Sequence, residues 1–149
     1  MRIIERLIAR PSAEELRGKE PDRLALTWEQ RRWLRGRFTT AAGREIALAL
    51  PTGTRIKPGA VVLVEAQWYV EIIAADEPLL AVFPPDHASA LKVAFEVGTR
   101  HFPLALSGRE LLVPDDPAMA HLMGRLGARF ERRVGAFEPI GFGAHGDDA

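Results

Sequence analysis

The sequence predicts two small domains, an all-β domain over residues 1–75 and an α+β domain over residues 76–138, followed by a flexible tail over residues 139–149. Three observations support this prediction. Short apolar segments separated by turn signals fill the first half, helical periodicity begins only in the second half, and the last residues are rich in glycine. At 149 residues, 47% of them hydrophobic, the chain is long enough to bury a core in each domain.

The first domain is predicted to contain five short strands. Residues 22–27 (DRLALT) and 44–50 (REIALAL) alternate polar and apolar side chains, as half-buried strands do. Turn signals at residues 51–53 and 57–59 bound the later strands. Helical periodicity is not evident in this half, so we expect an all-β unit. The expected strands are Arg2–Ile8, Asp22–Thr27, Arg44–Leu50, Val61–Val64 and Trp68–Ala74.

The second domain is predicted to mix strands and helices. A short apolar strand at residues 79–83 ends at two prolines, after which Asp86 can cap a helix. Gly98 lies where that helix is expected to end. A turn at Ser107 and Gly108 joins the two strands that follow. The apolar face of the helix is Leu91, Ala94 and Phe95, and the two strands are Phe102–Leu106 and Glu110–Val113.

A second helix is predicted between Asp116, its N-cap, and Gly127, where it stops. Pro117 occupies its first turn, where a missing N–H costs nothing. Its apolar stripe is Met119, Leu122, Met123 and Leu126. A last strand, Ala128–Val134, completes the order β-α-β-β-α-β, which is that of the ferredoxin-like split βαβ fold.

The composition excludes several classes of protein. Lys and Arg balance Asp and Glu, 20 against 20, so the chain lacks the positive field of a dedicated nucleic-acid binder. The absence of cysteine excludes disulfides, iron–sulfur clusters and thiolate zinc sites, and it suits a reducing compartment. The charged opening residues are unlike a signal peptide, and no run approaches membrane-spanning length. We therefore expect a cytoplasmic protein.

The motifs of common enzymes are absent from the sequence. There is no GxxxxGK(S/T) phosphate loop, no HExxH zinc motif and no cysteine nucleophile. Ser12, Ser89 and Ser107 do not stand in a nucleophile-elbow context. A binding function is therefore expected in place of catalysis.

One binding candidate is the basic segment RRWLRGR, Arg31–Arg37, with Trp28 just before it. Arginines interleaved with tryptophans on a short strand or loop can contact nucleic acid or an acidic protein surface. Because the net charge is zero, a protein partner is preferred and nucleic acid is the weaker alternative. The arginines could also form an ordinary solvated face.

The other candidate is His101, in the stretch VGTRHFPLAL. A histidine at such a junction is often a structural residue, but imidazole is also a good ligand for nickel, copper and zinc. His145 lies in the glycine-rich end, GFGAHGDDA, close to Asp147 and Asp148. His87 and His121 are expected to be surface residues, each with a smaller chance of being an auxiliary ligand.

Several motifs, in order, resemble the UreE family of urease accessory proteins. The family has a basic segment followed by an LPRGT stretch, and here RRWLRGR is followed by LALPTGTRIKPGAVVLVEAQ. Its later GNRH, LGA and FEPE motifs are matched by VGTRHFPLAL, RLGARFERR and AFEPIGFGAHG. The resemblance runs from about Leu26 to Gly146.

This resemblance implies a homodimeric nickel metallochaperone. The histidine of GNRH corresponds to His101, which would meet its symmetry mate at the dimer interface around one Ni(II), with His145 as a further ligand. The metal would be cargo, and Zn(II) or Cu(II) could replace it in vitro. The implied partners are the urease-activating GTPase and the apo-urease assembly, and the N-terminal domain would be of the partner- or peptide-binding type.

The chain departs from the family pattern at four places. Thr99 stands for the usual Asn, residues 95–96 (FE) stand where Tyr-His is frequent, and the tail keeps only His145. The start of the second helix reads Asp-Pro where relatives often have Asp-His. High-capacity nickel storage is therefore not expected, whereas the central site is.

Overall fold

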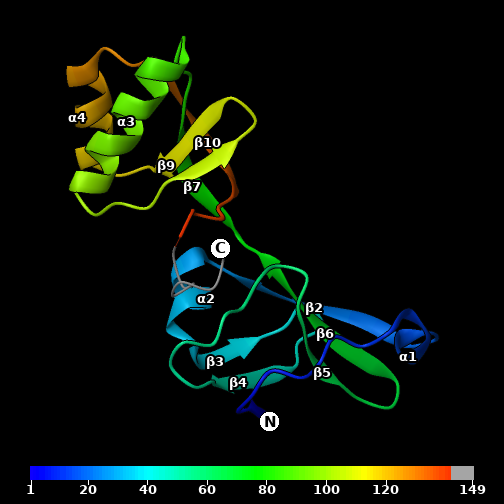
Figure 1. The fold of residues 1–149 in the computed structure, drawn as a ribbon. Coiled ribbons are helices and arrows are strands. Elements are labelled where there is room, and N and C mark those ends of the chain that lie inside the picture. The colour runs from blue at the N-terminus through cyan, green and yellow to red at the C-terminus, as the bar shows by residue number, and fades with distance from the viewer. Residues whose placement is uncertain (142–149) are drawn as a thin grey trace. The chain divides into compact units, whose positions relative to one another are not determined.

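The computed structural model describes residues 1–141 of the 149. The chain divides into two compact units, one formed by Met1–Ala75 and one that begins at Asp76 (Figure 1). Each unit has a hydrophobic core of its own. The two-domain architecture expected from the sequence is therefore present.

The N-terminal unit contains two three-stranded sheets, ordered β1-β4-β3 and β2-β6-β5. The pairs β1–β4 and β2–β6 are parallel, and β3–β4 and β5–β6 are antiparallel. Alternate residues of the strands are buried, for example Leu24 and Leu26, and Ile46 and Leu48. The strands are β1 (Arg2–Ile4), β2 (Glu20–Leu26), β3 (Arg35–Thr39), β4 (Glu45–Ala49), β5 (Val61–Val64) and β6 (Trp68–Ala74).

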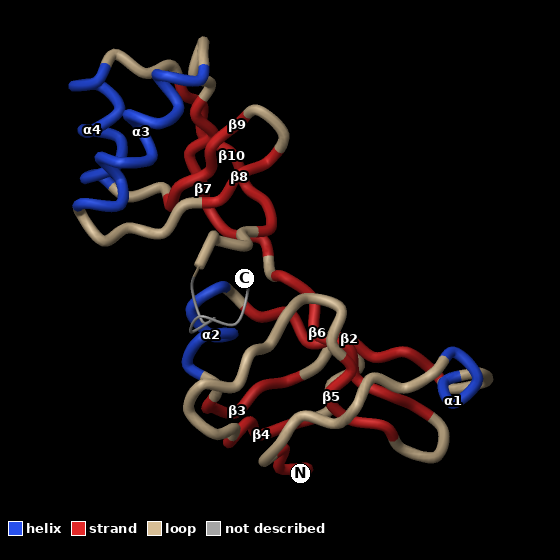
Figure 2. The backbone as a smooth tube through the Cα atoms, in the orientation of Figure 1, coloured by secondary structure: helices blue, strands red, loops and turns tan. Residues whose placement is uncertain are grey.

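The prediction that this unit is purely β was wrong. Two short helices are also present (Figure 2): in the chain, α1 (Ala13–Leu16) follows β1 and α2 (Trp28–Trp33) follows β2. Each helix starts with a capping box, in which Ser12 or Thr27 exchanges hydrogen bonds with the residue three positions later. Helices of four and six residues are too short to show an apolar period, so their caps are the only local signal.

The C-terminal unit has the predicted order β-α-β-β-α-β and one antiparallel sheet, ordered β10-β7-β9-β8. Both helices lie on the same side of this sheet (Figure 1). Residues of both helices, such as Val97 and Met123, share one core with Leu80 and Val113 of the sheet. The elements are β7 (Asp76–Val82), α3 (His87–Thr99), β8 (Ala105–Ser107), β9 (Glu110–Pro114), α4 (Pro117–Leu126) and β10 (Phe130–Ala136).

Helix α4 begins and ends where the sequence predicts. The Asp116 side chain accepts a hydrogen bond from the N–H of Ala118, and Gly127 closes the helix in the left-handed conformation, with φ of 68°. Met119, Leu122 and Met123 of the predicted stripe are buried. Cap residues and a stripe of apolar side chains together determine such a helix.

Helix α3 differs from the prediction in its end and in its buried face. It continues through Gly98 to Thr99, and the following strand starts at Ala105 instead of Phe102. The helix buries Val93 and Val97, whereas Leu91 and Phe95 of the predicted apolar face are exposed. This helix carries two apolar stripes, and periodicity does not say which of them meets the sheet.

The segment after β10 stays within the C-terminal unit. The Phe137 side chain is fully buried, and the N–H of Ile140 donates to the carbonyl oxygen of Leu104 at 2.8 Å. The structure thus places the first three residues of the predicted tail, and the rest of it, including His145, lies outside the described residues. Within residues 1–141, no helix has both the length and the apolar character needed to cross a membrane.

Candidate functional site

His101 lies immediately beyond α3, in a turn that caps the helix. Its backbone N–H donates to the carbonyl oxygen of Gly98 at 3.0 Å. The N–H of Phe102 donates to the carbonyl oxygen of Val97 at 3.3 Å. This pair of bonds is a Schellman motif, in which the first residue past the cap is left-handed. Val97 and Phe102 also belong to the same hydrophobic core, which is the apolar contact that usually accompanies the motif.

His101 itself is the left-handed residue, with φ of 60°. This position is usually glycine, because a Cβ there costs about 1–2 kcal/mol. The sequence suggested Gly98 for this role, but Gly98 lies inside the helix and His101 takes its place. The imidazole is exposed to solvent. A residue other than glycine at such a strained backbone position is a candidate functional residue.

The surroundings of His101 favour a cation. Carbonyl groups at the end of α3 carry the negative pole of the helix, about half a charge. The neighbouring Arg100 is held back along the helix, where its Nη1 donates to Oε1 of Glu96 at 2.7 Å and to the Glu96 carbonyl oxygen at 2.9 Å. This ion pair spans one helical turn and neutralises the guanidinium closest to His101 in sequence.

A complete metal site is not formed by the described part of one chain. Residues 1–141 contain no group of three or more His, Asp or Glu side chains that could hold an ion. His87 begins α3, roughly 20 Å from His101 at 1.5 Å per helical residue, and His121 is exposed on α4. Both are surface residues, as expected. His145 lies outside the described residues, so the structure does not test its part in the site.

An exposed apolar stripe on α3 leads toward His101. Leu91 and Phe95 are 58% and 69% exposed, they lie one turn apart, and Gly98 continues the stripe as an exposed residue. Large apolar side chains that gather on one exposed face commonly mark a contact with another protein surface. The stripe therefore runs along α3 toward its C-terminal end, and His101 follows two residues after the helix ends.

The basic segment is less available than the sequence suggested. Arg31 is buried, only 7% exposed, and its Nη1 donates to the carbonyl oxygen of Leu26. It is a structural residue of α2 and cannot reach nucleic acid or a partner. Arg35 and Arg37 lie on β3 and are exposed, and Trp33 before them is 69% exposed. The segment is thus a helix followed by a strand, instead of a strand or loop throughout.

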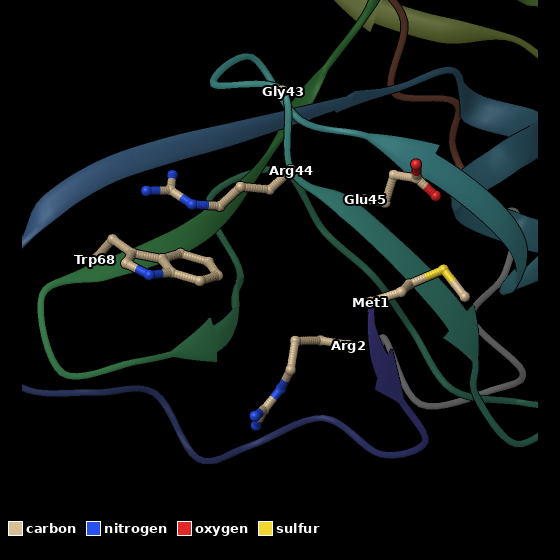
Figure 3. Close-up of a pocket in the computed structure, with 6 residues that line it drawn as sticks. All are labelled: Met1, Arg2, Gly43, Arg44, Glu45 and Trp68. Carbon is tan, nitrogen blue, oxygen red and sulfur yellow. The ribbon is translucent and has the colours of Figure 1, made fainter.

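A shallow pocket of about 490 Å³ in the N-terminal unit is lined by Met1, Arg2, Gly43, Arg44, Glu45 and Trp68 (Figure 3). Its cations are already engaged. The Arg44 guanidinium lies over the Trp68 ring at 4.0 Å, and Arg2 pairs with Glu65 at 3.1 Å. The pocket contains one carboxylate and no histidine, so it lacks the ligand set of a metal site.

The buried carboxylate of Asp22 also proves to be structural. It accepts hydrogen bonds from the Thr40 hydroxyl, from Arg44 at 2.9 Å, and from the N–H groups of Ala42 and Arg23. Burial would raise the pKa of Asp22, but these four hydrogen bonds together lower it. The carboxylate is therefore charged and fully occupied, and it ties β2 to the β3–β4 turn. This cluster could not be found from the sequence, because its residues are far apart along the chain.

Comparison with known proteins covers both units. A family model for the N-terminal domain of UreE urease accessory protein matches residues 3–75, and one for the C-terminal domain matches residues 77–149. The urease accessory protein UreE of Burkholderia thailandensis is 34% identical over 157 aligned residues, which cover 100% of this chain and 73% of that protein. The protein of the same name from Burkholderia mallei strain SAVP1 is 34% identical over 131 residues, 85% of this chain. The chain spans 64% of the length of that relative.

Proposed function

Since the chain belongs to the UreE family of urease accessory proteins, we propose that it is a nickel metallochaperone that delivers Ni(II) for maturation of the urease active site. The observation that carries this proposal is His101, an exposed imidazole kept at a left-handed position where glycine is favoured. The nitrogen ligand suits nickel, and the chain has no cysteine to offer in its place.

We propose that the site is shared by two copies of the chain. One histidine cannot hold an ion firmly, but a twofold axis brings the same residue from both protomers together. The exposed stripe of Leu91, Phe95 and Gly98 supplies an apolar surface next to His101 that a second copy would cover. Pairing of two α3 helices along this stripe would set the two His101 side chains near the axis.

His145 is proposed as a further ligand that arrives from the tail. Ile140 is hydrogen-bonded to Leu104, which is three residues from His101 in the sequence. The five residues from Ile140 to His145 span at most about 17 Å when extended. The tail is therefore long enough to bring His145 to the same ion.

A carrier needs a site that both holds and releases its ion. Two histidines, with water or tail residues in the remaining positions, leave nickel accessible to an acceptor. The proposed acceptors of the nickel ion are the urease-activating GTPase and the apo-urease assembly, in the cytoplasm. The nickel is cargo, so the proposed role is carriage and not catalysis. Because copper binds nitrogen sites more tightly than nickel, the supply of metal or the partner must provide the selectivity, and Zn(II) or Cu(II) can occupy the site in vitro.

Nickel stoichiometry tests this function. Isothermal titration of the full chain with Ni(II), together with native mass spectrometry, should give one tightly bound ion per two chains. His101→Ala should lose this ion, and its circular dichroism spectrum should remain that of the folded protein. His121→Ala is the matched control, an exposed histidine of the same unit, and it should bind as the parent does. One independent ion per chain, retained in His101→Ala, would exclude the shared site.

A further inference from the structure

Strand β3 forms one edge of its sheet and leaves its outer side unpaired. The order β1-β4-β3 places β4 on one side of β3, and within residues 1–141 no strand pairs with the other side. Figures 1 and 2 show β3 beside β4. A free edge exposes N–H and C=O groups that can pair with another extended chain.

The register identifies which residues present these groups. The N–H of Leu50 donates to Leu34 at 3.1 Å, and the N–H of Thr40 donates to Arg44 at 2.8 Å, so the positions just before and just after β3 bond toward β4. Bonding alternates along an antiparallel strand. Gly36 and Phe38 therefore also bond to β4, and Arg35, Arg37 and Thr39 direct their N–H and C=O groups outward.

The same residues present positive charge. Arg35 and Arg37 are exposed and lie opposite Ala49 and Ala47, whose side chains are small and half-buried. Neither guanidinium has an ion pair or hydrogen bond with another residue of the described chain. Trp33, 69% exposed, precedes the strand, and Trp and Arg are the residue types most enriched at binding hot spots.

The other face of β3, to which Gly36 and Phe38 belong, is apolar. A Cβ at Gly36 would meet ring carbons of Phe38 at 3.1 and 3.2 Å, so the ring lies against the Gly36 backbone. Phe38 packs on the core of the unit but remains partly accessible. An extended chain along this edge would thus meet positive charge on one face and an aromatic ring on the other.

We propose that β3 binds an acidic segment of a partner protein by antiparallel strand addition, with a preference for acidic-apolar-acidic sequences. Residues paired across two strands point to the same face, so acidic side chains two positions apart would lie opposite Arg35 and Arg37. The apolar residue between them would face the Phe38 ring. A second copy of β3 is a poor occupant, because arginines would meet arginines, and like charges across strands are destabilising.

Peptide binding tests this site without metal, so that its failure is separate from failure of the nickel function. The probe is a fluorescein-labelled Thr-Val-Glu-Val-Glu-Val-Thr peptide, titrated with the full chain in EDTA and followed by anisotropy. Its control, Thr-Val-Val-Glu-Glu-Val-Thr, has the same composition but directs its glutamates to opposite faces. The first peptide should bind at least about tenfold more tightly. Equal affinity for both would overturn the proposal.

Charge reversal locates the site. Arg35→Glu/Arg37→Glu should weaken binding at least about tenfold and allow the corresponding Lys peptide to bind. Arg17→Glu/Arg109→Glu is the matched control, since both arginines are exposed and the net charge changes equally. An equal loss in the control would mean that only the global field matters. Tighter binding of a single-stranded DNA 12-mer than of the peptide, lost in the same variant, would assign the edge to nucleic acid instead.

Backbone methylation tests the strand pairing. In the antiparallel arrangement the glutamate N–H groups face β3 and the central valine N–H faces away. N-methylation of the two glutamates should abolish binding, whereas N-methylation of the central valine should leave it nearly unchanged. Binding that survives glutamate methylation would exclude strand addition.

Discussion

The N–H of His101 donates to the carbonyl oxygen of Gly98, 3.0 Å away, and this bond holds His101 in the left-handed conformation at the end of α3. Because the bond is made by the backbone, the helix end does not depend on the imidazole. The side chain can therefore be replaced without loss of the turn, and the stability and the metal affinity of the protein can be measured apart.

The first prediction compares two replacements of His101. In metal-free protein, His101→Gly should raise the free energy of unfolding by about 0.5–1 kcal/mol, because glycine adopts a φ of 60° without strain. His101→Ala should give no such gain, and both should lose the nickel site. Urea unfolding of both variants and the parent, at one fixed chain concentration, measures these free energies of unfolding. A less stable His101→Gly would show that the side chain contributes to the fold.

The second prediction concerns the proposed dimer. Phe95→Glu should raise the dimer dissociation constant strongly, since a charge would be buried in the apolar stripe next to Gly98. Val134→Glu is the matched control, because Val134 has the same exposure, 69%, and lies on β10. Light scattering coupled to size exclusion measures both. If Phe95→Glu remained a dimer, the stripe of α3 would not be the interface.

The third prediction concerns the tail. Deletion of residues 144–149 should weaken nickel affinity modestly and leave the ratio of one ion per two chains intact, because the two His101 side chains remain. His145→Ala in the full chain separates the loss of the imidazole from the loss of the tail. Unchanged affinity in both variants would leave His145 without a role in binding.

The fourth prediction is that nickel affinity depends on pH. Imidazole coordinates metal only in its neutral form, so protons compete with nickel below about pH 6.5. With two obligatory histidines, apparent affinity should fall by up to roughly a hundredfold per pH unit once both are mostly protonated. A site made of carboxylates would hardly change until near about pH 4. Titrations from pH 7.5 to 5 separate the two, and a flat profile would exclude histidine ligands.

The fifth prediction concerns acid stability of the N-terminal unit. The hydrogen bonds to Asp22 lower its pKa in the folded state, so the unfolded chain binds a proton more readily and stability is lost as pH falls below about 4. Asp22→Asn should lower the free energy of unfolding at pH 7 by about 2–4 kcal/mol, because Arg44 loses its buried partner. The free energy of unfolding of this variant should also change less than that of the parent between pH 5 and pH 2. Glu110→Gln, in the more exposed pair with Arg133, should have a much smaller effect.

Much of the fold could be predicted because local signals agreed with the tertiary structure. Strands β5 and β6 and helix α4 end where the turn and cap residues predict. Helix α2 was missed because its six residues carry no apolar period, although Thr27 and Gln30 form a capping box that could have revealed it. Strand β3 was missed with it, since burial alternates poorly on an edge strand whose residues are mostly exposed.

The sequence singled out His101 as a candidate ligand but did not predict its backbone geometry. His101 was found from its residue type and its place between two elements, whereas its left-handed backbone belongs to a position where glycine was expected. The outward stripe of α3 could not be distinguished from its buried stripe, because Val93 and Val97 repeat with the same spacing as Leu91 and Phe95. Which stripe meets the sheet depends on strands that lie more than ten residues away.

The parallel pairing of β2 with β6, Glu20 opposite Trp68 and Leu26 opposite Ala74, sets the order in which the N-terminal unit can form during synthesis. A strand cannot pair before its partner has left the ribosome, so β2 must wait while the intervening residues are made, at roughly 5–20 residues per second. Pairing over such a separation is also slow to form once both strands are present. During this interval Leu24 and Leu26, which end fully packed, are open to solvent and to other nascent chains. The newly made chain is thus most vulnerable to aggregation before this pairing is complete.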